Sequence, residues 1–245
     1  MRTALPRFWM ALALGTIAVS CASRPGLRAG QHAAEFRKRV VRNVRLSYLL
    51  FLPRDLASRP AWPMMVFLHG SGERGDDLEA VKRNGPPRIV EDRPDFPFIL
   101  VSPLCPKNEG WDIRAILALL DDLAERLPVD RDRVYATGLS MGGDGTWALA
   151  LAAPRRFAAI APISGVGDPE SACALRSVPV WAFHGAVDPV VPLREDQEMV
   201  EALRACGGDA KLTVYPDAGH DAWTAAYGDP ALYAWLLAHR RAAAR

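Results

Sequence analysis

Hydrophobic and polar residues follow one another in blocks that are typical of alternating strands and helices. Short apolar runs rich in β-branched and aromatic residues predict eight strands, near residues 36–41, 45–52, 64–68, 98–103, 133–137, 158–163, 178–183 and 210–215. Longer Ala- and Leu-rich or amphipathic segments predict helices near residues 112–126, 141–153, 196–205 and 230–242. The alternation predicts an α/β protein whose mostly parallel eight-stranded sheet is flanked by helices on both faces.

The first residues have a different pattern. Arg2 and Arg7 precede the apolar run 8–19, which is too short for an ordinary transmembrane helix but typical of a secretory signal. The run ends in Ala-Val-Ser-Cys at 18–21, which resembles the lipobox of bacterial lipoproteins, in which the cysteine, here Cys21, is acylated. We therefore expect three parts, a signal peptide over 1–21, a tether over 22–35 and one globular domain over 36–245.

Two outcomes remain open for this N-terminus. Acylation of Cys21 would anchor the protein to a membrane, as a periplasmic or outer-membrane-anchored lipoprotein of a bacterium. Plain cleavage of the signal would release it as a secreted protein. Both outcomes export the chain.

Composition agrees with one globular domain. Half of the 245 residues are hydrophobic, 24% are charged, and the formal charge of +2 gives no reason to expect nucleic acid as a partner. Beyond the signal, Cys105, Cys173 and Cys206 are odd in number, so at least one thiol stays free. A disulfide between Cys173 and Cys206 is conceivable but is not determined by the sequence. No spacing of cysteines and histidines suggests a zinc site, and we expect no cofactor or metal.

The segment 138–142, GLSMG, lies where a strand pattern gives way to a helix pattern. It predicts a nucleophile elbow, a sharp turn that exposes a serine hydroxyl at the top of a sheet. Such a turn brings strand and helix so close that the positions two residues before and after the serine must be nearly without side chains. Gly138 and Gly142 meet this need. Ser140 is therefore the candidate nucleophile.

A serine nucleophile needs a general base, and the base needs a carboxylate to orient it. His220 lies on a glycine-containing loop after the strand near 210–215, and Asp188 follows the strand near 178–183. Loops that leave the carboxyl ends of parallel strands meet at one edge of the sheet, where active sites form. We expect His220 to be the base and Asp188 the acid. His184 is interpreted as a packed histidine at a strand end.

An oxyanion in acyl transfer needs two backbone N–H donors. The first candidate is the N–H of Met141, immediately after the nucleophile. The strand near 64–68 runs into a glycine-rich turn, HGSG, in which the N–H of Ser71 is the second candidate. His69 is expected to brace this turn through hydrogen bonds.

Four segments together resemble motifs of the α/β-hydrolase superfamily and occur in the chain order that is typical of it. They are FLHGSGERG at 67–75, GLSMGG at 138–143, HGAVD at 184–188 and GH at 219–220. The resemblance covers about residues 36–240. It is to the small exported esterase and predicted-peptidase branch, near dienelactone-hydrolase-like, feruloyl-esterase-like and polyhydroxyalkanoate-depolymerase-like proteins, and it implies the α/β-hydrolase fold. Asp144 departs from the pattern, because that branch usually has an aromatic residue there.

Cap domains of this superfamily are commonly inserted between the predicted strands that end at Ile163 and begin at Val178. Only about fifteen residues separate them here. We therefore expect no cap domain and an open cleft. An open cleft favours a soluble or polymer-attached ester as the substrate, and it argues against the buried tunnel of a lipase.

The candidate substrate contacts are Trp111, Trp223, Asp144 and Arg74. The two tryptophans are expected near the rim, where they either stack on a substrate ring or pack the loops. Asp144 either stabilises the first turn of the helix after the nucleophile or borders a substrate pocket. Arg74 either pairs with Glu73 to hold the oxyanion loop or binds a substrate carboxylate.

The residues thus predict a serine hydrolase that cleaves small-molecule or polymer-attached carboxylic esters through an acyl-enzyme. A serine peptidase acting on short peptides is the alternative among enzymes. A non-catalytic exported binding protein on a hydrolase scaffold is the alternative from another class. Such proteins usually lose a triad member, whereas Ser140, Asp188 and His220 are all present.

Overall fold

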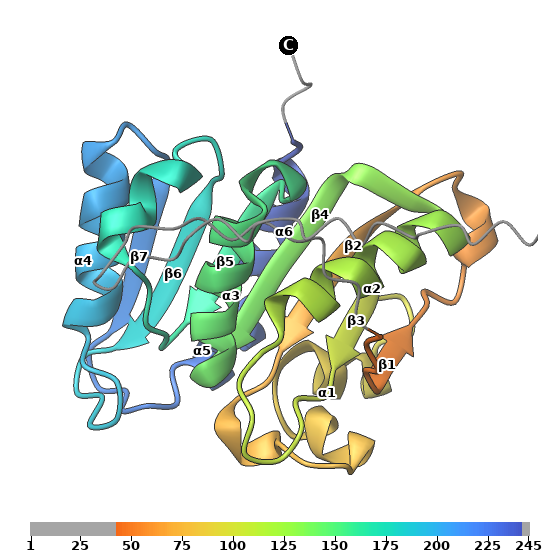
Figure 1. The fold of residues 1–245 in the computed structure, drawn as a ribbon, viewed down its shortest axis with the longest axis horizontal. Helices are drawn as coiled ribbons and strands as arrows, with labels where there is room; N and C mark the ends of the chain where they lie inside the picture. Colours follow the sequence, from red (N-terminus) through yellow and green to blue (C-terminus); the bar gives the residue numbers. More distant parts are fainter. Residues whose placement is uncertain (1–42, 242–245) are drawn as a thin grey trace, which may run out of the picture. The chain divides into compact units, whose positions relative to one another are not determined.

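A seven-stranded sheet organises residues 43–241, which are the residues described by this computed structural model (Figure 1). The strands are β1 (Tyr48–Phe51), β2 (Trp62–Leu68), β3 (Ile99–Pro103), β4 (Val129–Leu139), β5 (Ala159–Ile163), β6 (Val180–Gly185) and β7 (Ala210–Tyr215). Their order across the sheet is β1-β3-β2-β4-β5-β6-β7. Only β1 runs antiparallel to its neighbour; the other five pairs are parallel.

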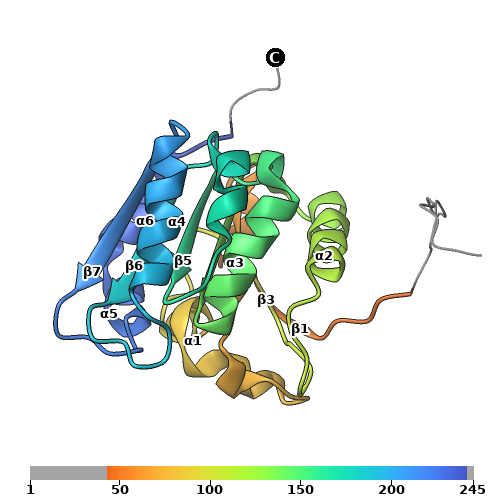
Figure 2. The same ribbon diagram turned by 60° about the vertical axis from the view of Figure 1, so that its left-hand side comes forward.

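Six helices cover the two faces of the sheet. They are α1 (Gly85–Asp92), α2 (Ile113–Arg126), α3 (Met141–Ala152), α4 (Arg194–Ala205), α5 (Trp223–Gly228) and α6 (Pro230–Ala238). Helices α2, α3 and α4 lie on one face, and α1, α5 and α6 lie on the other (Figures 1 and 2). Because both faces are covered, every residue of β2, β5 and β6 is buried, and β4 is buried over its carboxyl-terminal half, from Val134 to Leu139.

Alternation along β2 assigns its side chains to the two layers. Met64, Val66 and Leu68 belong to the core beneath α2, α3 and α4. Met65 and Phe67 belong to the core beneath α1, α5 and α6. A strand whose successive side chains point to opposite faces joins both cores into one domain.

The predicted α/β class and mostly parallel sheet are confirmed. Seven of the eight predicted strands appear, and the eighth, near 36–41, lies outside the described residues. Two helices were missed. Helix α1 begins Gly-Pro-Pro, which obscures a helical pattern although proline is tolerated in a first turn, and α5 has only six residues.

The connection between β5 and β6 contains only a short 3₁₀ segment, Pro169–Leu175, so the fold has no cap domain at this position. Cys173, in that segment, forms a disulfide with Cys206 at the end of α4. Cys105 is a buried free thiol. Among the helices of residues 43–241, none combines the length and the hydrophobicity that a membrane crossing requires.

Candidate active site

Ser140 stands at the junction of β4 and α3, with φ 52° and ψ −123°. This positive φ is strained for a residue with a side chain, and such strain is common at functional sites. The flanking glycines permit the turn. A Cβ on Gly138 would lie 2.2 Å from the carbonyl oxygen of Gly142, and a Cβ on Gly142 would lie 1.9 Å from that of Leu68. The predicted nucleophile elbow is therefore present in the structure.

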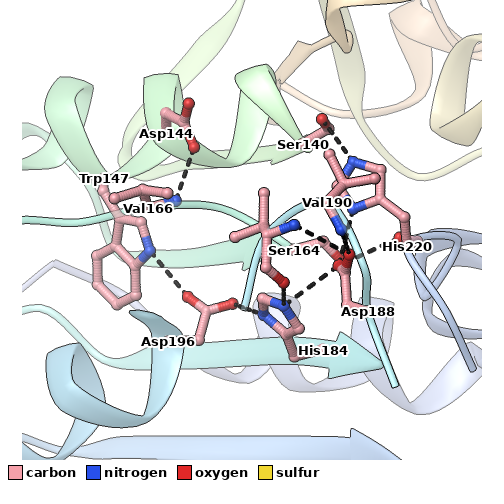
Figure 3. A network of polar contacts seen from close by, with 11 residues as sticks. Ser140, Asp144, Trp147, Ser164, Val166, His184, Asp188, Val190, Asp196 and His220 are labelled. Carbon is pink, nitrogen blue, oxygen red and sulfur yellow. Dashed lines mark hydrogen bonds and ion pairs between the residues drawn. The ribbon is translucent and has the colours of Figure 1, made fainter. Parts of the chain in front are cut away.

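Three side chains from separate loops meet at the carboxyl edge of the sheet (Figure 3). Nε2 of His220 lies 2.8 Å from Oγ of Ser140, and Nδ1 of His220 lies 2.7 Å from Oδ2 of Asp188. A carboxylate only accepts, so Nδ1 carries the hydrogen and Nε2 is free to accept the serine proton. The structure thus brings together the three residues that the sequence analysis selected as nucleophile, base and acid.

The Asp188 side chain is fully buried, whereas that of His220 is 19% exposed. Oδ1 of Asp188 accepts from the backbone N–H groups of Val190 at 2.8 Å and Val191 at 3.0 Å. Burial alone would raise the pKa of this carboxyl group. The hydrogen bonds from His220 and from the two N–H groups outweigh burial and lower the pKa, so Asp188 is ionised at neutral pH.

The glycine-rich turn after β2 packs against the nucleophile. A Cβ on Gly70 would lie 3.6 Å from Cβ of Ser140. Ser71 begins the 3₁₀ segment Ser71–Glu73, and Met141 begins α3. First residues of helical turns have N–H groups without an intrahelical acceptor, so both remain suitable oxyanion donors.

His69 braces this turn, as expected. Its Nδ1 donates to the carbonyl of Gly70 at 2.6 Å, and its Nε2 accepts from the N–H of Cys105 at 3.0 Å. Each ring nitrogen therefore has one role, which fits the neutral imidazole. Burial lowers the pKa of His69 and favours the same form. His69 thus ties the loop after β2 to the loop after β3.

Glu73 and Arg74 have other partners than each other. Buried Glu73 accepts from Nδ2 of Asn84 at 2.9 Å. Arg74 donates to the carbonyls of Ser71 at 3.2 Å and Glu109 at 3.1 Å. The structural role expected for Arg74 therefore arises through backbone carbonyls, and the Glu73–Arg74 pair that the sequence suggested is wrong.

Trp111 packs inside the loops. Its ring centre lies 4.7 Å from that of His69, and a Cβ on Gly145 would approach the indole to 2.6 Å. Its Nε1 is buried and has no hydrogen-bond partner. Of the two roles that the sequence left open for Trp111, these contacts are those of loop packing.

Asp144 holds the loop after β5. Its Oδ1 accepts from the N–H of Val166 at 2.6 Å (Figure 3). Burial raises the pKa of this carboxyl group, and the hydrogen bond from Val166 opposes the rise. The carboxylate is therefore engaged with the protein backbone, which is a more specific role than the solvated or capping aspartate expected from its place in the helix.

Trp223 stands edge-on to His220, with ring centres 5.2 Å apart. It also lines a pocket of about 390 Å³ between α1 and α5. Arg83 and Arg88 line the same pocket, and no carboxylate is among its lining residues in the described part of the chain. Sequence reasoning missed this pocket because it did not predict α1 and α5, which form its walls.

Asp196 is a further polar residue at the site that sequence reasoning missed. It is fully buried, and its Oδ2 lies 2.7 Å from Nδ1 of His184. Its position in α4 was a usable indication, because Met199, Val200 and Leu203 place the same helix face in the core. A carboxylate on that face must have a buried partner. His184 is buried as predicted, but it belongs to a polar network.

Within residues 43–241, no group of three or more His, Cys, Asp or Glu side chains is arranged to hold a metal ion.

The sequence matches the model of a known protein family. Residues 95–237 match the model described as the dienelactone hydrolase family. The chain belongs to the dienelactone hydrolase family. This membership agrees with the α/β-hydrolase resemblance that the sequence motifs indicated, and it places the chain among hydrolases.

Two named proteins illustrate the relationship of this dienelactone hydrolase family member to others. A protein of Aspergillus niger named feruloyl esterase C is 26% identical over 218 residues, which cover 85% of this chain and 76% of that protein. A protein of Salmonella typhimurium named carboxymethylenebutenolidase is 33% identical over 147 residues, 56% of this chain and 53% of that protein. The match thus spans about half of the Salmonella protein.

Solved structures agree on the fold. A thermostable esterase is 31% identical with a TM-score of 0.73, over 81% of this chain and 60% of that chain. A dienelactone hydrolase homologue from Klebsiella pneumoniae has a TM-score of 0.60 at 20% identity, over 79% of this chain and 99% of that chain, which shows the shared fold. This dienelactone hydrolase family member therefore has the α/β-hydrolase fold.

Proposed function

We propose that this protein is a serine hydrolase that cleaves carboxylic esters through an acyl-enzyme on Ser140. The observation that carries the proposal is the continuous chain of contacts from Ser140 Oγ through His220 to Asp188, at 2.8 Å and 2.7 Å. The strained φ of Ser140 at a strand-to-helix turn supports it. The relatives named as esterases support an ester as the substrate.

The mechanism follows from the proton positions. Nε2 of His220 takes the Ser140 proton as the oxygen attacks the ester carbonyl, and then gives that proton to the leaving alcohol. Water activated by His220 hydrolyses the acyl-enzyme in the second half of the cycle. Ionised Asp188 keeps the His220 hydrogen on Nδ1 and stabilises the imidazolium form.

The charge that develops on the carbonyl oxygen requires donors that are already in place. The N–H groups of Met141 and Ser71 are the proposed pair, because each begins a helical turn beside Ser140. Loss of one such donor typically costs about 2.7–4 kcal/mol of transition-state stabilisation. The bracing contacts of His69 keep the second donor's loop in position.

One substituent of the ester would occupy the pocket between α1 and α5. Trp223 connects that pocket to the catalytic base, and Asn84, through Glu73, connects it to the oxyanion turn. An indole face favours a planar or aromatic group. Arg83 and Arg88 at its rim favour groups that are neutral or negatively charged.

A fluorophosphonate probe tests the chemistry directly, because it reacts with an activated serine whatever the natural substrate. We expect covalent labelling at Ser140, identified by peptide mass spectrometry, together with turnover of nitrophenyl acyl esters and of feruloyl or acetyl sugars. Preferential cleavage of aminoacyl amides would indicate a peptidase instead. A folded protein without labelling or turnover would indicate a binding protein on a hydrolase scaffold.

The proposed location is outside the cytoplasm of a bacterium, with the protein held at a membrane by an acylated Cys21. The support is the apolar run 8–19 and the sequence Ala-Val-Ser-Cys at 18–21, in which it ends. These residues lie outside the part of the chain that the structure describes. Mass spectrometry of the mature N-terminus separates the acylated form from a plainly cleaved one.

A further inference from the structure

We propose that His184 and Asp196 form a buried ion pair whose positive end holds Asp188 ionised and oriented, and that the pair thereby extends the acid range in which His220 acts as a base. The proposal rests on the proposed roles of Asp188 and His220. His184 and Asp196 are positioning residues in it, since neither touches the reacting atoms.

His184 lies between Asp196 and Asp188. His184 is in β6, Asp196 is in the first turn of α4, and Asp188 is in the loop between them (Figure 3). Nε2 of His184 lies 3.3 Å from Oδ2 of Asp188, the oxygen that accepts from His220. The side chains of His184, Asp188 and Asp196 are all fully buried, so water does not weaken the contacts of His184 with the two carboxyl groups.

The hydrogen-bond partners of His184 determine how many protons the pair holds. Nε2 of His184 faces the carbonyl of Val191 at 3.0 Å and the carboxylate of Asp188 at 3.3 Å, and both groups only accept. Nε2 must therefore carry a hydrogen. A second hydrogen must lie between Nδ1 and Asp196, because their 2.7 Å contact would otherwise join two acceptors. The pair thus holds two protons.

The second proton of the pair can lie on Asp196 or on His184, and the surroundings and basicities of the two groups decide between them. Nε1 of Trp147 donates to Oδ1 of Asp196 at 3.1 Å, and the N–H of Gly165 donates to the same carboxylate. N–H donors favour the ionised form of a carboxyl group. Burial would lower the pKa of His184, but the bond to Asp196 and the contact with Val191 outweigh burial and raise it. Burial outweighs the N–H donors and raises the pKa of Asp196 as well. The second proton lies on His184 because an imidazole is the stronger base by about 2 to 3 pKa units in water, so the pair is an imidazolium and a carboxylate.

The positive charge of the pair acts on the proposed triad through Asp188. The charged groups that act on His184 are Asp196 from α4 and Asp188 from the loop after β6. Asp144, on α3, acts on Asp196 and on His220. An imidazolium beside Asp188 favours its ionised form and disfavours a second cation on His220. His220 therefore stays neutral, and able to accept a proton, at a lower pH than Asp188 alone would allow.

The variant Asp196→Asn tests this effect. The asparagine can still accept from Trp147 and donate to Nδ1 of His184, which then becomes neutral. We expect the acid limb of kcat/KM to move to higher pH by about half a unit to one unit. The rate at pH 8 should fall by about tenfold at most. An acid limb that coincides with that of the wild type would overturn the proposal.

Thr213→Val is the matched control. Thr213 lies in β7, and its hydroxyl accepts from the indole of Trp181 in the neighbouring strand β6, so the variant removes a polar contact close to His184 without touching the pair. It should lower the melting temperature without moving the acid limb, because it leaves the His184–Asp196 pair intact. An equal shift of the acid limb in Thr213→Val would assign the effect to general destabilisation and would also overturn the proposal.

NMR on the wild-type protein tests the His184–Asp196 ion pair even if Asp196→Asn does not fold. In ¹⁵N-histidine-labelled protein, both ring nitrogens of His184 should carry protons from pH 6 to pH 9, with assignment from the signal lost in His184→Gln. A ring nitrogen without a proton at pH 7 would refute the ion pair. The NMR measurement needs no turnover, so it tests the ion pair independently of the proposed esterase chemistry. Failure of that chemistry would instead appear as full activity of Ser140→Ala.

Discussion

Nδ1 of His220 donates to Oδ2 of Asp188 at 2.7 Å, although the two residues are 32 positions apart in the chain. They lie on the loops that follow β7 and β6. These strands are parallel neighbours whose register pairs Gly185 with Tyr215 at their carboxyl ends. A short departure from each strand is therefore sufficient to bring acid and base together, and this edge carries the whole proposed active site.

Removal of the nucleophile or the base should abolish turnover. We expect Ser140→Ala and His220→Ala each to reduce kcat by roughly 10⁴-fold, and the double variant to lose little more, because the two residues act as a unit. Steady-state rates on a nitrophenyl ester, with far-UV circular dichroism as the folding control, provide the measurement. A tenth of wild-type activity in folded Ser140→Ala would refute the acyl-enzyme mechanism.

Gly142 should tolerate no side chain. Its Cβ would lie 1.9 Å from the carbonyl oxygen of Leu68, so Gly142→Ala must displace backbone at the elbow. We expect a loss of about 1–3 kcal/mol in the free energy of unfolding, together with a severe loss of activity. Gly110→Ala is the matched control, because nothing lies within 4 Å of its Cβ. Urea unfolding of both variants checks the contrast, and equal stabilities would contradict it.

Asp144 should influence stability more than specificity. Asp144→Ala removes the acceptor for the N–H of Val166, at a cost of about 1 kcal/mol, and loosens the loop after β5. We therefore expect rates on acetyl, bulky and cationic esters to fall in parallel. The measurement is kcat/KM across that panel, with Asp144→Tyr as a second variant. A selective change for bulky or positively charged esters in either variant would instead place Asp144 in a substrate pocket.

Trp223 should discriminate between acyl groups. Because it lines the pocket between α1 and α5, Trp223→Ala should raise KM for an aromatic acyl ester several-fold more than KM for the acetyl ester. Trp223→Phe keeps a ring and should restore much of the difference. Comparing the ratio of the two KM values removes any common effect that arises through His220. An unchanged ratio in Trp223→Ala would exclude this pocket from substrate binding.

Cys21 should determine membrane association. If it is acylated, Cys21→Ser should release the protein into the soluble periplasmic or extracellular fraction, or block processing. Fractionation followed by immunoblotting checks the outcome. An unmodified mature N-terminus beyond Cys21 would refute the anchor and leave simple secretion.

The sequence by itself determined the fold class and the three residues of the proposed triad. Apolar runs such as β2 can be buried on both faces only inside a parallel sheet covered by helices, so composition and period were sufficient. The elbow was equally local, because Gly138, Ser140 and Gly142 create its geometry within five positions. His220 and Asp188 followed from their places after predicted strands.

Only the tertiary structure decided which partners the remaining polar groups have. Trp147 reaches Asp196 across 49 positions. Asn84 reaches Glu73 from the position just before α1, a helix that the sequence pattern did not reveal. Such contacts depend on how helices pack on the sheet, whereas hydrophobic periodicity specifies only which face of a helix is buried. A buried charge is stabilised by the particular donor that packing brings to it, and that donor can come from any position in the chain.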